Sequence, residues 1–309
     1  MFTGMAMSCY SAIKRILVPR LTRKLSGCHL HTCASTCAAA PPDDVTHSWL
    51  TTVGGGTVDL TKDESSGLAV LTLNNPERLN AVTGNMMLQL ANIVNDLKDW
   101  RNGKALIVHG KGHTFCPGAD LNMVRNMLDS KQGQEMCAFM HKTLTELHRL
   151  PLISVAAIDG HAIGGGSELC TATDFRVMTE RANIRFIHAL MGVVPGWGGG
   201  TRLTRLVGRT RALDLLSSGR PIGPEEALEI GLANWIIPTG HDVVEATAEW
   251  LQKYTKGKTE VVRALKNVVV AGSELPVEEA LEREAEQFVD VWGGPAHEEA
   301  ILKSMKHKK

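Results

Sequence analysis

The sequence predicts an α/β fold with a helical C-terminal segment. A short apolar run typical of a buried strand, a glycine-rich turn and a helical pattern follow one another twice, beginning at Ala105 and again at Leu152. From Pro224 onward the spacing of apolar residues is mainly helical. With 309 residues, of which 43% are hydrophobic and 21% charged, the chain can bury a sizeable core.

The N-terminal stretch is predicted to lie outside this fold. Residues 1–42 contain no Asp or Glu but carry five basic side chains among Ser, Thr and apolar residues: Lys14, Arg15, Arg20, Arg23 and Lys24. This composition is typical of a mitochondrial transit peptide, and a disordered basic leader that is never imported is the alternative. We expect residues 1–47 to form this leader, with the folded domain starting near residue 48.

The cysteines favour a reducing compartment over a disulfide framework. Their number, seven, is odd, and four of them lie in the leader: Cys9, Cys28, Cys33 and Cys37. Together with the histidines of this stretch they are spaced too irregularly for a metal cluster, so neither a metal nor a cofactor is predicted.

The net charge and the hydropathy of the chain indicate which class of partner it binds. Lys plus Arg and Asp plus Glu each total 33, so the formal net charge is zero and nothing favours a nucleic acid. The chain has no run of about 18 apolar residues, so we expect no membrane-spanning helix. A small molecule is the better expectation.

Four strands are predicted from apolar and β-branched runs: Leu68–Leu73, Ala105–Val108, Leu152–Ile158 and Phe175–Met178. Thr83 precedes a helical stripe that we expect to be core rather than cofactor surface, formed by Met86, Met87, Leu90, Ile93, Val94 and Leu97.

Helices dominate the second half of the chain. The loop Pro195–Gly200 leads into a helix around Leu203, and three further helices are predicted at Asp242–Tyr254, Glu260–Val270 and Val277–Val291. The charged face of the last helix is expected in solvent, with its apolar stripe packed on the core or on another subunit.

Two glycine-rich turns are the candidate chemical features: Cys116-Pro-Gly-Ala-Asp120 and Gly164-Gly-Gly-Ser-Glu168. The first N–H groups of a helix have no intrahelical partner, and glycine lets a ligand approach such a backbone closely. Fixed N–H groups stabilise an oxygen on which negative charge grows, as on a thioester carbonyl that becomes an enolate. A single turn of this kind is equally well explained as structural.

Three motifs, in this order and spacing, resemble the crotonase (enoyl-CoA hydratase/isomerase) superfamily: Phe115–Leu121, Ala162–Leu169 and Met191–Leu203. The resemblance covers roughly residues 65–305. It implies a β-β-α spiral core at residues 48–240, a helical C-terminal segment at residues 241–309, coenzyme A thioester substrates, and a homo-oligomer, either a trimer or a hexamer. It also implies that the backbone N–H groups of Ala119 and Gly165 form an oxyanion hole.

The acid–base residues of the site indicate which of the superfamily's reactions a member catalyses. A hydratase needs two carboxylates around one water, because it adds both parts of that water across a double bond. The resemblance places the first at Glu168, but the position of the second, four residues before Gly192, holds His188. Hydration is therefore disfavoured, although an imidazole can still shuttle a proton. The alternative for His188 is a surface or packing histidine.

Decarboxylation of a malonyl-type thioester needs fewer groups. The departing CO2 leaves its electrons in the thioester carbonyl, and an oxyanion hole stabilises the resulting enolate without any base. The site must hold the substrate carboxylate out of the thioester plane, keep it poorly solvated, and then deliver a proton to carbon. His188 or a protonated Glu168 is the candidate donor.

A closer resemblance is to the branch of the superfamily that decarboxylates alkylmalonyl-CoA thioesters. It rests on six segments: Leu73–Pro76, Met86–Leu90, Leu150–Val155, Ile184–His188, Pro195–Trp197 and Val291–Ala296. It implies conversion of ethylmalonyl-CoA to butyryl-CoA, with methylmalonyl-CoA a lesser substrate, as metabolite repair in the cytosol. Two departures, at Cys116-Pro117 and at Trp197–Thr201, adjoin the expected pocket and leave the preference between the two substrates open.

Two other hypotheses remain at this point. One is a hydratase or isomerase that uses Glu168 as its sole carboxylate, and the other is an inactive member of the fold that binds RNA or a partner. The neutral charge and the two intact turns count against the second. For location, the resemblance favours the cytosol, and the leader makes mitochondria the alternative.

Overall fold

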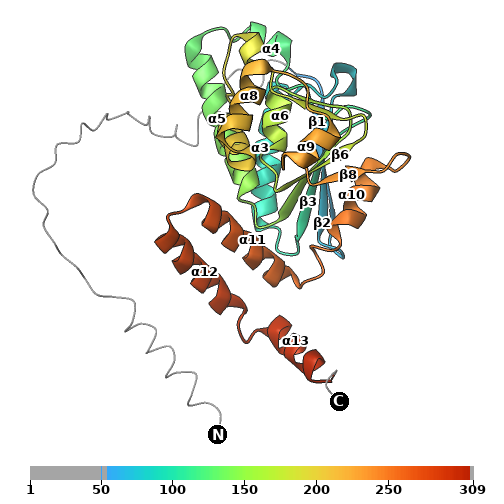
Figure 1. The fold of residues 1–309 in the computed structure, drawn as a ribbon, viewed down its shortest axis with the longest axis vertical. Coiled ribbons are helices and arrows are strands. Elements are labelled where there is room, and N and C mark those ends of the chain that lie inside the picture. The colour runs from blue at the N-terminus through green and yellow to red at the C-terminus, as the bar shows by residue number, and fades with distance from the viewer. Residues whose placement is uncertain (1–49, 51–53, 307–309) are drawn as a thin grey trace, which may run out of the picture. The chain divides into compact units, whose positions relative to one another are not determined.

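Among the described residues, six strands form the main sheet, in the order β1-β2-β3-β4-β6-β8, and two more form a small second sheet, β5-β7 (Figure 1). This computed structural model describes residue 50 and residues 54–306, all within one compact unit. The predicted leader, with its basic residues and its cysteines and histidines, lies outside the described residues. The α/β prediction is confirmed.

The main sheet is mostly parallel. Only β1 and β2 pair as an antiparallel hairpin, and every other neighbouring pair in it is parallel. Its strands are β1 (Thr57–Asp63), β2 (Leu68–Asn74), β3 (Ala105–Gly110), β4 (Ile153–Ile158), β6 (Phe175–Thr179) and β8 (Trp235–Ile237). The four predicted strands are confirmed as β2, β3, β4 and β6, whereas β1 and β8 were not predicted.

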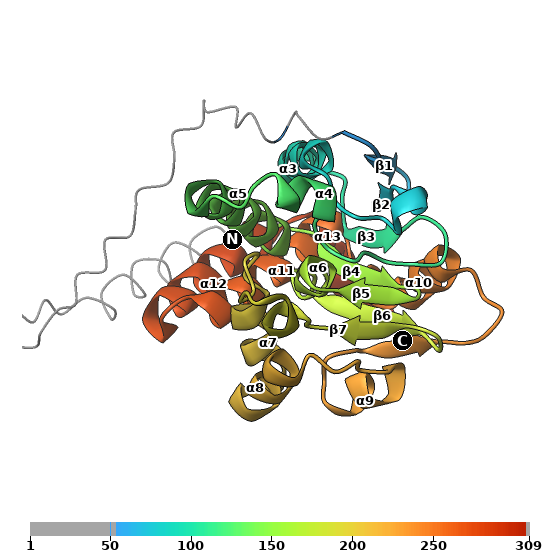
Figure 2. The same ribbon diagram turned by 90° about the horizontal axis from the view of Figure 1, so that it is seen from above.

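Both faces of the sheet are covered, as the continuous apolar run of β3 requires. Successive side chains of a strand point to opposite faces. Leu106 and Val108 therefore face the larger core, and Ala105 and Ile107 face a smaller one that α10 (Val243–Leu251) completes. Figure 2 shows α3 and α5 on one side of the sheet and α10 on the other.

Helices α3 (Gly84–Asp99) and α5 (Ser130–His148) cover the larger core. Thr83 begins α3, with its hydroxyl accepting the Met86 N–H at 3.3 Å, and Met86 and Met87 are fully buried, which confirms the core assignment of this stripe. The other helical elements are η1 (Pro76–Arg78), α4 (Leu121–Arg125), α6 (Gly165–Cys170), η2 (His188–Met191), α7 (Gly199–Val207), α8 (Arg209–Ser218), α9 (Pro224–Glu229), α11 (Thr259–Glu274), α12 (Val277–Val291) and α13 (Pro295–Lys306).

The apolar stripe of α12 does not pack on the core. The helix lies against α11, where Asn267 donates to Gln287 at 2.8 Å, and none of its residues is buried. Leu281, Phe288 and Val289 are all more than half exposed. The other predicted partner of this stripe, another subunit, stays a prediction. Across the described residues, no helix has the length and apolar character needed to cross a membrane.

The small sheet brings the two glycine-rich turns together. Its strands are β5 (His161–Ile163) and β7 (Asn183–Arg185), and β5 leads directly into the second turn at Gly164. Bridges from Cys116 to Ala162 and from Val82 to Ala119 extend the small sheet across the first turn. The turn after β3 is thereby fixed beside the start of α6.

Candidate active site

The two predicted turns lie in direct contact. Cys116 donates its N–H to the His161 carbonyl and accepts from Ile163, both at 2.9 Å. Gly118 has a φ of +99°, and a Cβ at this position would lie 2.7 Å from the Gly165 nitrogen. Only glycine fits here, because both the backbone conformation and the close approach exclude a side chain.

Two backbone donors are left free where the turns meet. The β-bridge between Val82 and Ala119 is formed by hydrogen bonds of the residues on either side of Ala119: Val82 donates to Gly118 O, and Asp120 donates to Val82 O. Gly165 is the first residue of α6, so its N–H has no intrahelical acceptor. Within the described part of the chain, the N–H groups of Ala119 and Gly165 have no hydrogen-bond partner.

Asp120 fixes the first turn to α4. Its carboxylate accepts the N–H groups of Asn122 and Met123 at 2.9 and 3.2 Å, and it pairs with Arg78 at 2.7 Å. Burial opposes ionisation of this carboxyl, but Arg78 and the two N–H groups outweigh it and hold the pKa of Asp120 below its usual value. The preceding residue, Ala119, is thus anchored on its C-terminal side.

Cys116 supports the turn as a neutral packing group. The side chain is fully buried, and its sulfur receives the Gly118 N–H at 3.3 Å. Burial raises the pKa of the Cys116 thiol to about 12, so the thiolate required of a nucleophile is not formed near neutral pH.

Glu168 is buried, and four groups surround its carboxylate. Oε1 lies 3.0 Å from His188 Nε2 and accepts the Gly196 N–H at 3.2 Å, while Oε2 accepts the N–H groups of Trp197 and Gly199 at 2.7 and 2.8 Å. The glycine-rich loop therefore wraps around this carboxylate. Gly199 has to be glycine, because a Cβ there would lie 2.4 Å from Glu168 Cγ.

His188 is also buried, which contradicts its surface alternative. It begins η2, 7% exposed, and its Nε2 faces Glu168. Its other ring nitrogen, Nδ1, is buried without a hydrogen-bond partner among the described residues. Leaving such an atom unsatisfied costs about 1–3 kcal/mol, so Nδ1 is available for a ligand or a water.

Arg202 and Trp197 contribute to the site in ways that sequence reasoning missed. Arg202 donates to Trp197 O at 2.6 Å, to Glu168 O at 3.3 Å and to Thr171 Oγ1 at 3.2 Å, which ties the loop to α6. The Trp197 ring covers Gly165, where a Cβ would lie 2.7 Å from it. The only sequence signal was the run of glycines around these two residues.

The structure therefore brings Glu168 together with His188, and the Gly118–Ala119 turn together with Gly165. Among the described residues, no cluster of three or more His, Cys, Asp or Glu is placed to hold a metal ion. A cavity of about 730 Å³ lies elsewhere, between α5, α7 and α11, and none of the four predicted site residues lines it.

Comparison with known proteins gives consistent results. A family model described as enoyl-CoA hydratase/isomerase matches residues 63–306. Ethylmalonyl-CoA decarboxylase of Xenopus tropicalis is 51% identical over 255 residues, covering 82% of this chain and 85% of that protein. The Homo sapiens protein of the same name is 47% identical over 257 residues, covering 82% of this chain and 83% of that protein.

Solved structures share the fold. An enoyl-CoA hydratase from Geobacillus kaustophilus matches with a TM-score of 0.76 and 29% identity, over 82% of this chain and 96% of that one. A putative enoyl-CoA hydratase from Thermobifida fusca in complex with acetoacetyl-CoA matches with a TM-score of 0.67 and 26% identity, over 75% and 93% of the two chains. The family model spans nearly all described residues, and the two ethylmalonyl-CoA decarboxylases are identical to this chain at about half of the aligned positions. This chain therefore belongs to the enoyl-CoA hydratase/isomerase family.

Proposed function

We propose that the chain decarboxylates 2-alkylmalonyl-CoA thioesters, converting ethylmalonyl-CoA to butyryl-CoA and accepting methylmalonyl-CoA as a lesser substrate. The observation that carries this proposal is the Glu168–His188 pair, in which an imidazole stands where a hydratase needs its second carboxylate. The relatives named ethylmalonyl-CoA decarboxylase support it.

The two free backbone donors are assigned to the enolate. When the bond between C2 and the substrate carboxylate breaks, its electron pair moves into the thioester and CO2 departs. Negative charge grows on the thioester oxygen, where the N–H groups of Ala119 and Gly165 are already fixed. Each such donor typically accounts for about 10²–10³ in rate.

His188 is assigned to the proton that completes the reaction. The enolate carbon must gain one proton to become the CH2 group of butyryl-CoA. With Nε2 bound to Glu168, Nδ1 is the ring atom left to carry that proton. Solvent then reprotonates His188, so each turnover consumes one proton and releases one CO2.

Glu168 acts by positioning in this proposal rather than by donating a proton. Three backbone N–H groups and the His188 ring already occupy both of its oxygens. Protonation of either oxygen would remove an acceptor site that a loop N–H group already uses. The carboxylate instead sets the orientation of His188 and closes the loop that places Trp197 over Gly165.

A two-substrate assay tests the reaction. Purified protein is mixed separately with ethylmalonyl-CoA and with crotonyl-CoA, and CO2, butyryl-CoA and 3-hydroxybutyryl-CoA are measured. We expect stoichiometric CO2 and butyryl-CoA from the first substrate and no hydration of the second. Hydration of crotonyl-CoA without CO2 from ethylmalonyl-CoA would identify a hydratase and refute the proposal. Methylmalonyl-CoA, assayed in parallel, should show the lower kcat/KM.

We further propose that the enzyme works in the cytosol, as metabolite repair. The resemblance of the sequence to the cytosolic decarboxylating branch supports this, and the acid-free leader is the reason to test it. A fluorescent protein fused to the C-terminus of the full chain should give diffuse cytosolic signal, the same as a chain lacking residues 1–47. Mitochondrial signal that disappears on deletion would show that the leader is a transit peptide.

A further inference from the structure

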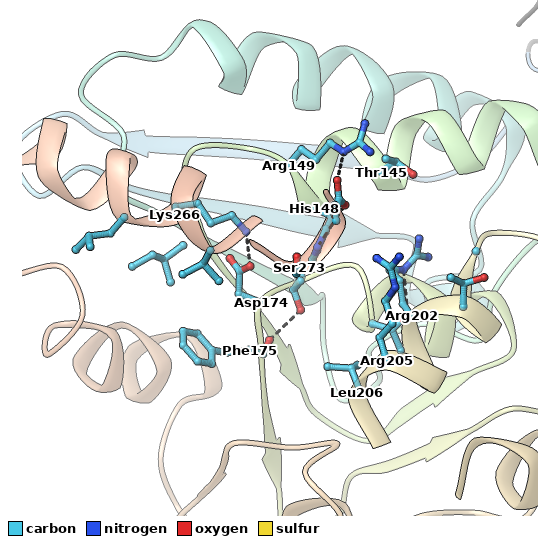
Figure 3. Close-up of a pocket in the computed structure, with 18 of the residues that line it drawn as sticks. Thr145, His148, Arg149, Asp174, Phe175, Arg202, Arg205, Leu206, Lys266 and Ser273 are labelled. Carbon is cyan, nitrogen blue, oxygen red and sulfur yellow. Dashed lines mark hydrogen bonds and ion pairs between the residues drawn. The ribbon is translucent and has the colours of Figure 1, made fainter. Parts of the chain in front are cut away.

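The 730 Å³ cavity (Figure 3) adjoins the site described above, sharing Gly198 and Arg202 with its loop but none of Ala119, Gly165, Glu168 and His188. It lies at the C-terminal end of α6, beside Thr171, Thr173 and Asp174, whereas the free Gly165 N–H lies at the opposite end of that helix. Most of its lining comes from α5, α7 and α11. The volume falls within the range of ordinary small-molecule pockets, about 300–1,000 Å³.

The cavity carries an excess of positive charge. Four Arg or Lys side chains line it against two carboxylates, Asp174 and Glu274. Asp174 pairs with Lys266, and Glu274 pairs with Arg149 at 2.7 Å. Burial, and then the nearby Lys266, lower the pKa of His148, which keeps that ring neutral. The two remaining cations are Arg202 and Arg205.

Arg202 and Arg205 lie side by side on α7 without a carboxylate between them (Figure 3). They are three residues apart on one helix, so they repel one another. No described residue forms an ion pair or hydrogen bond with Arg205, and the Arg202 Nη1 group makes no hydrogen bond within the described residues. This arrangement fits a carboxylate, which Arg205 can bind through two N–H groups and Arg202 through Nη1.

Part of the lining is apolar. Phe175, Leu265 and Val269 form this part, and the exposed fractions of Leu265 and Val269 are 61% and 66%. An occupant that covered them would remove this apolar surface from water. We propose that the cavity binds an alkyl carboxylate, with its carboxylate on Arg202 and Arg205 and its chain along α11.

Arg202 connects this cavity to the active site. The same guanidinium that faces the cavity donates to Trp197 O and Glu168 O. A carboxylate bound at its Nη1 edge therefore acts on the loop that surrounds Glu168. In this respect the inference rests on the proposed function, and we expect saturating ligand to change kcat by at least about twofold while leaving KM unchanged.

Decanoate is the probe, titrated calorimetrically into the full-length protein without substrate. Saturable binding is expected, with decanol and decyltrimethylammonium binding at least tenfold more weakly because they lack the anion. Arg205→Gln should weaken decanoate binding about tenfold or more, since one charge-assisted contact is lost. The matched control is Arg209→Gln, an exposed arginine on α8 outside the cavity, which should bind as the native protein does.

Several outcomes would overturn the inference. These are the absence of saturable binding, equal binding by Arg205→Gln, equal binding of decanol, and displacement of decanoate by coenzyme A, which would place decanoate in the thioester site. A kcat that saturating decanoate does not alter would refute the connection through Arg202. Because binding is measured without turnover, a protein that binds decanoate but releases no CO2 would contradict the proposed function alone.

Discussion

Unpaired atoms distinguish the reacting residues of this site from the residues that support them. The N–H groups of Ala119 and Gly165 and the Nδ1 atom of His188 have no partner in the described structure, while both Glu168 oxygens are fully engaged. Polar groups that a fold leaves buried and unsatisfied cost stability, so they tend to be retained where a ligand completes them. The assignment of roles follows this division.

His188→Gln tests the proton donor. Glutamine can still bond to Glu168 but cannot carry the extra proton of an imidazolium, so we expect kcat to fall by about 10²-fold or more with little change in KM. In D2O the native enzyme should make butyryl-CoA deuterated at C2 in one configuration, and the variant should make both. Unchanged turnover with a single configuration would mean that another group or an ordered water delivers the proton.

Gly118→Ala tests the meeting point of the two turns. The new Cβ would lie 2.7 Å from the Gly165 nitrogen, so one oxyanion donor is displaced and kcat should fall by about 10²-fold or more. Gly112→Ala is the matched control, since Gly112 also has a positive φ, +79°, but a Cβ there would meet no other atom within 4 Å. Both variants should lose about 1–2 kcal/mol of folding stability from the positive φ, and Gly118→Ala more because its Cβ also meets backbone. Equal losses of activity would contradict the assignment of Gly165.

At the scale of single residues, the sequence motifs identified the candidate site residues but could not predict which of them are in contact. The three motifs were sufficient to single out Ala119, Gly165, Glu168 and His188. The pairing of Glu168 with His188 depends on the three-dimensional course of a loop 20 residues further on, which no local pattern encodes. The same is true of Arg202, whose sequence position is that of an ordinary helical arginine.

Elements were predictable where a single pattern is long enough to be recognised. β3 is six residues of nearly unbroken apolar sequence, and α3 combines an N-cap threonine with a buried stripe. β5, β7 and β8 have three residues each, too few to reveal the two-residue alternation of apolar and polar side chains that predicts a strand. α5 was not predicted, because its first six residues carry no large apolar side chain and its apolar stripe begins only at Met136.

Asp120→Asn tests how α4 anchors the first turn. Asparagine keeps the helix cap but loses the pair with Arg78, which is partly exposed, so we expect a cost of about 1 kcal/mol at pH 7. Because the folded-state pKa of Asp120 lies below its usual value, this contribution is present above about pH 4 and disappears as the pH falls through the folded pKa. Urea unfolding at pH 7 and at successively lower pH measures both effects.

Asp129→Asn is the control for that experiment. Asp129 stands at the same capping position before α5 but makes no capping hydrogen bond through its side chain. Its replacement should leave the unfolding free energy unchanged at either pH. A difference between native protein and Asp120→Asn that persists at the lowest pH would show that the stabilisation does not come from the ionised carboxylate.

At the scale of the whole molecule, the main open feature is the apolar surface of α12, which is exposed in the single chain. Leu281 and Phe288 on this helix and Trp292 just after it are more than half exposed, and the Phe288 and Trp292 rings lie 4.9 Å apart between centroids, tilted by 30°. Apolar patches of this kind on a folded protein commonly mark interaction sites. We propose that this surface joins copies of the chain into the trimer or hexamer that the family resemblance implies.

Replacing Leu281 and Phe288 together by Glu tests this assembly. Native protein should sediment with three or six times the mass of one chain, and the double variant as smaller species, because two carboxylates would have to be buried without partners. Glu282→Gln, on the same helix and equally in solvent, should leave the assembly intact. None of the three positions is buried in the single chain, so circular dichroism should show the same helix content in all variants. A native protein that sediments as one chain, or a double variant that still assembles, would exclude α12 as the contact between subunits.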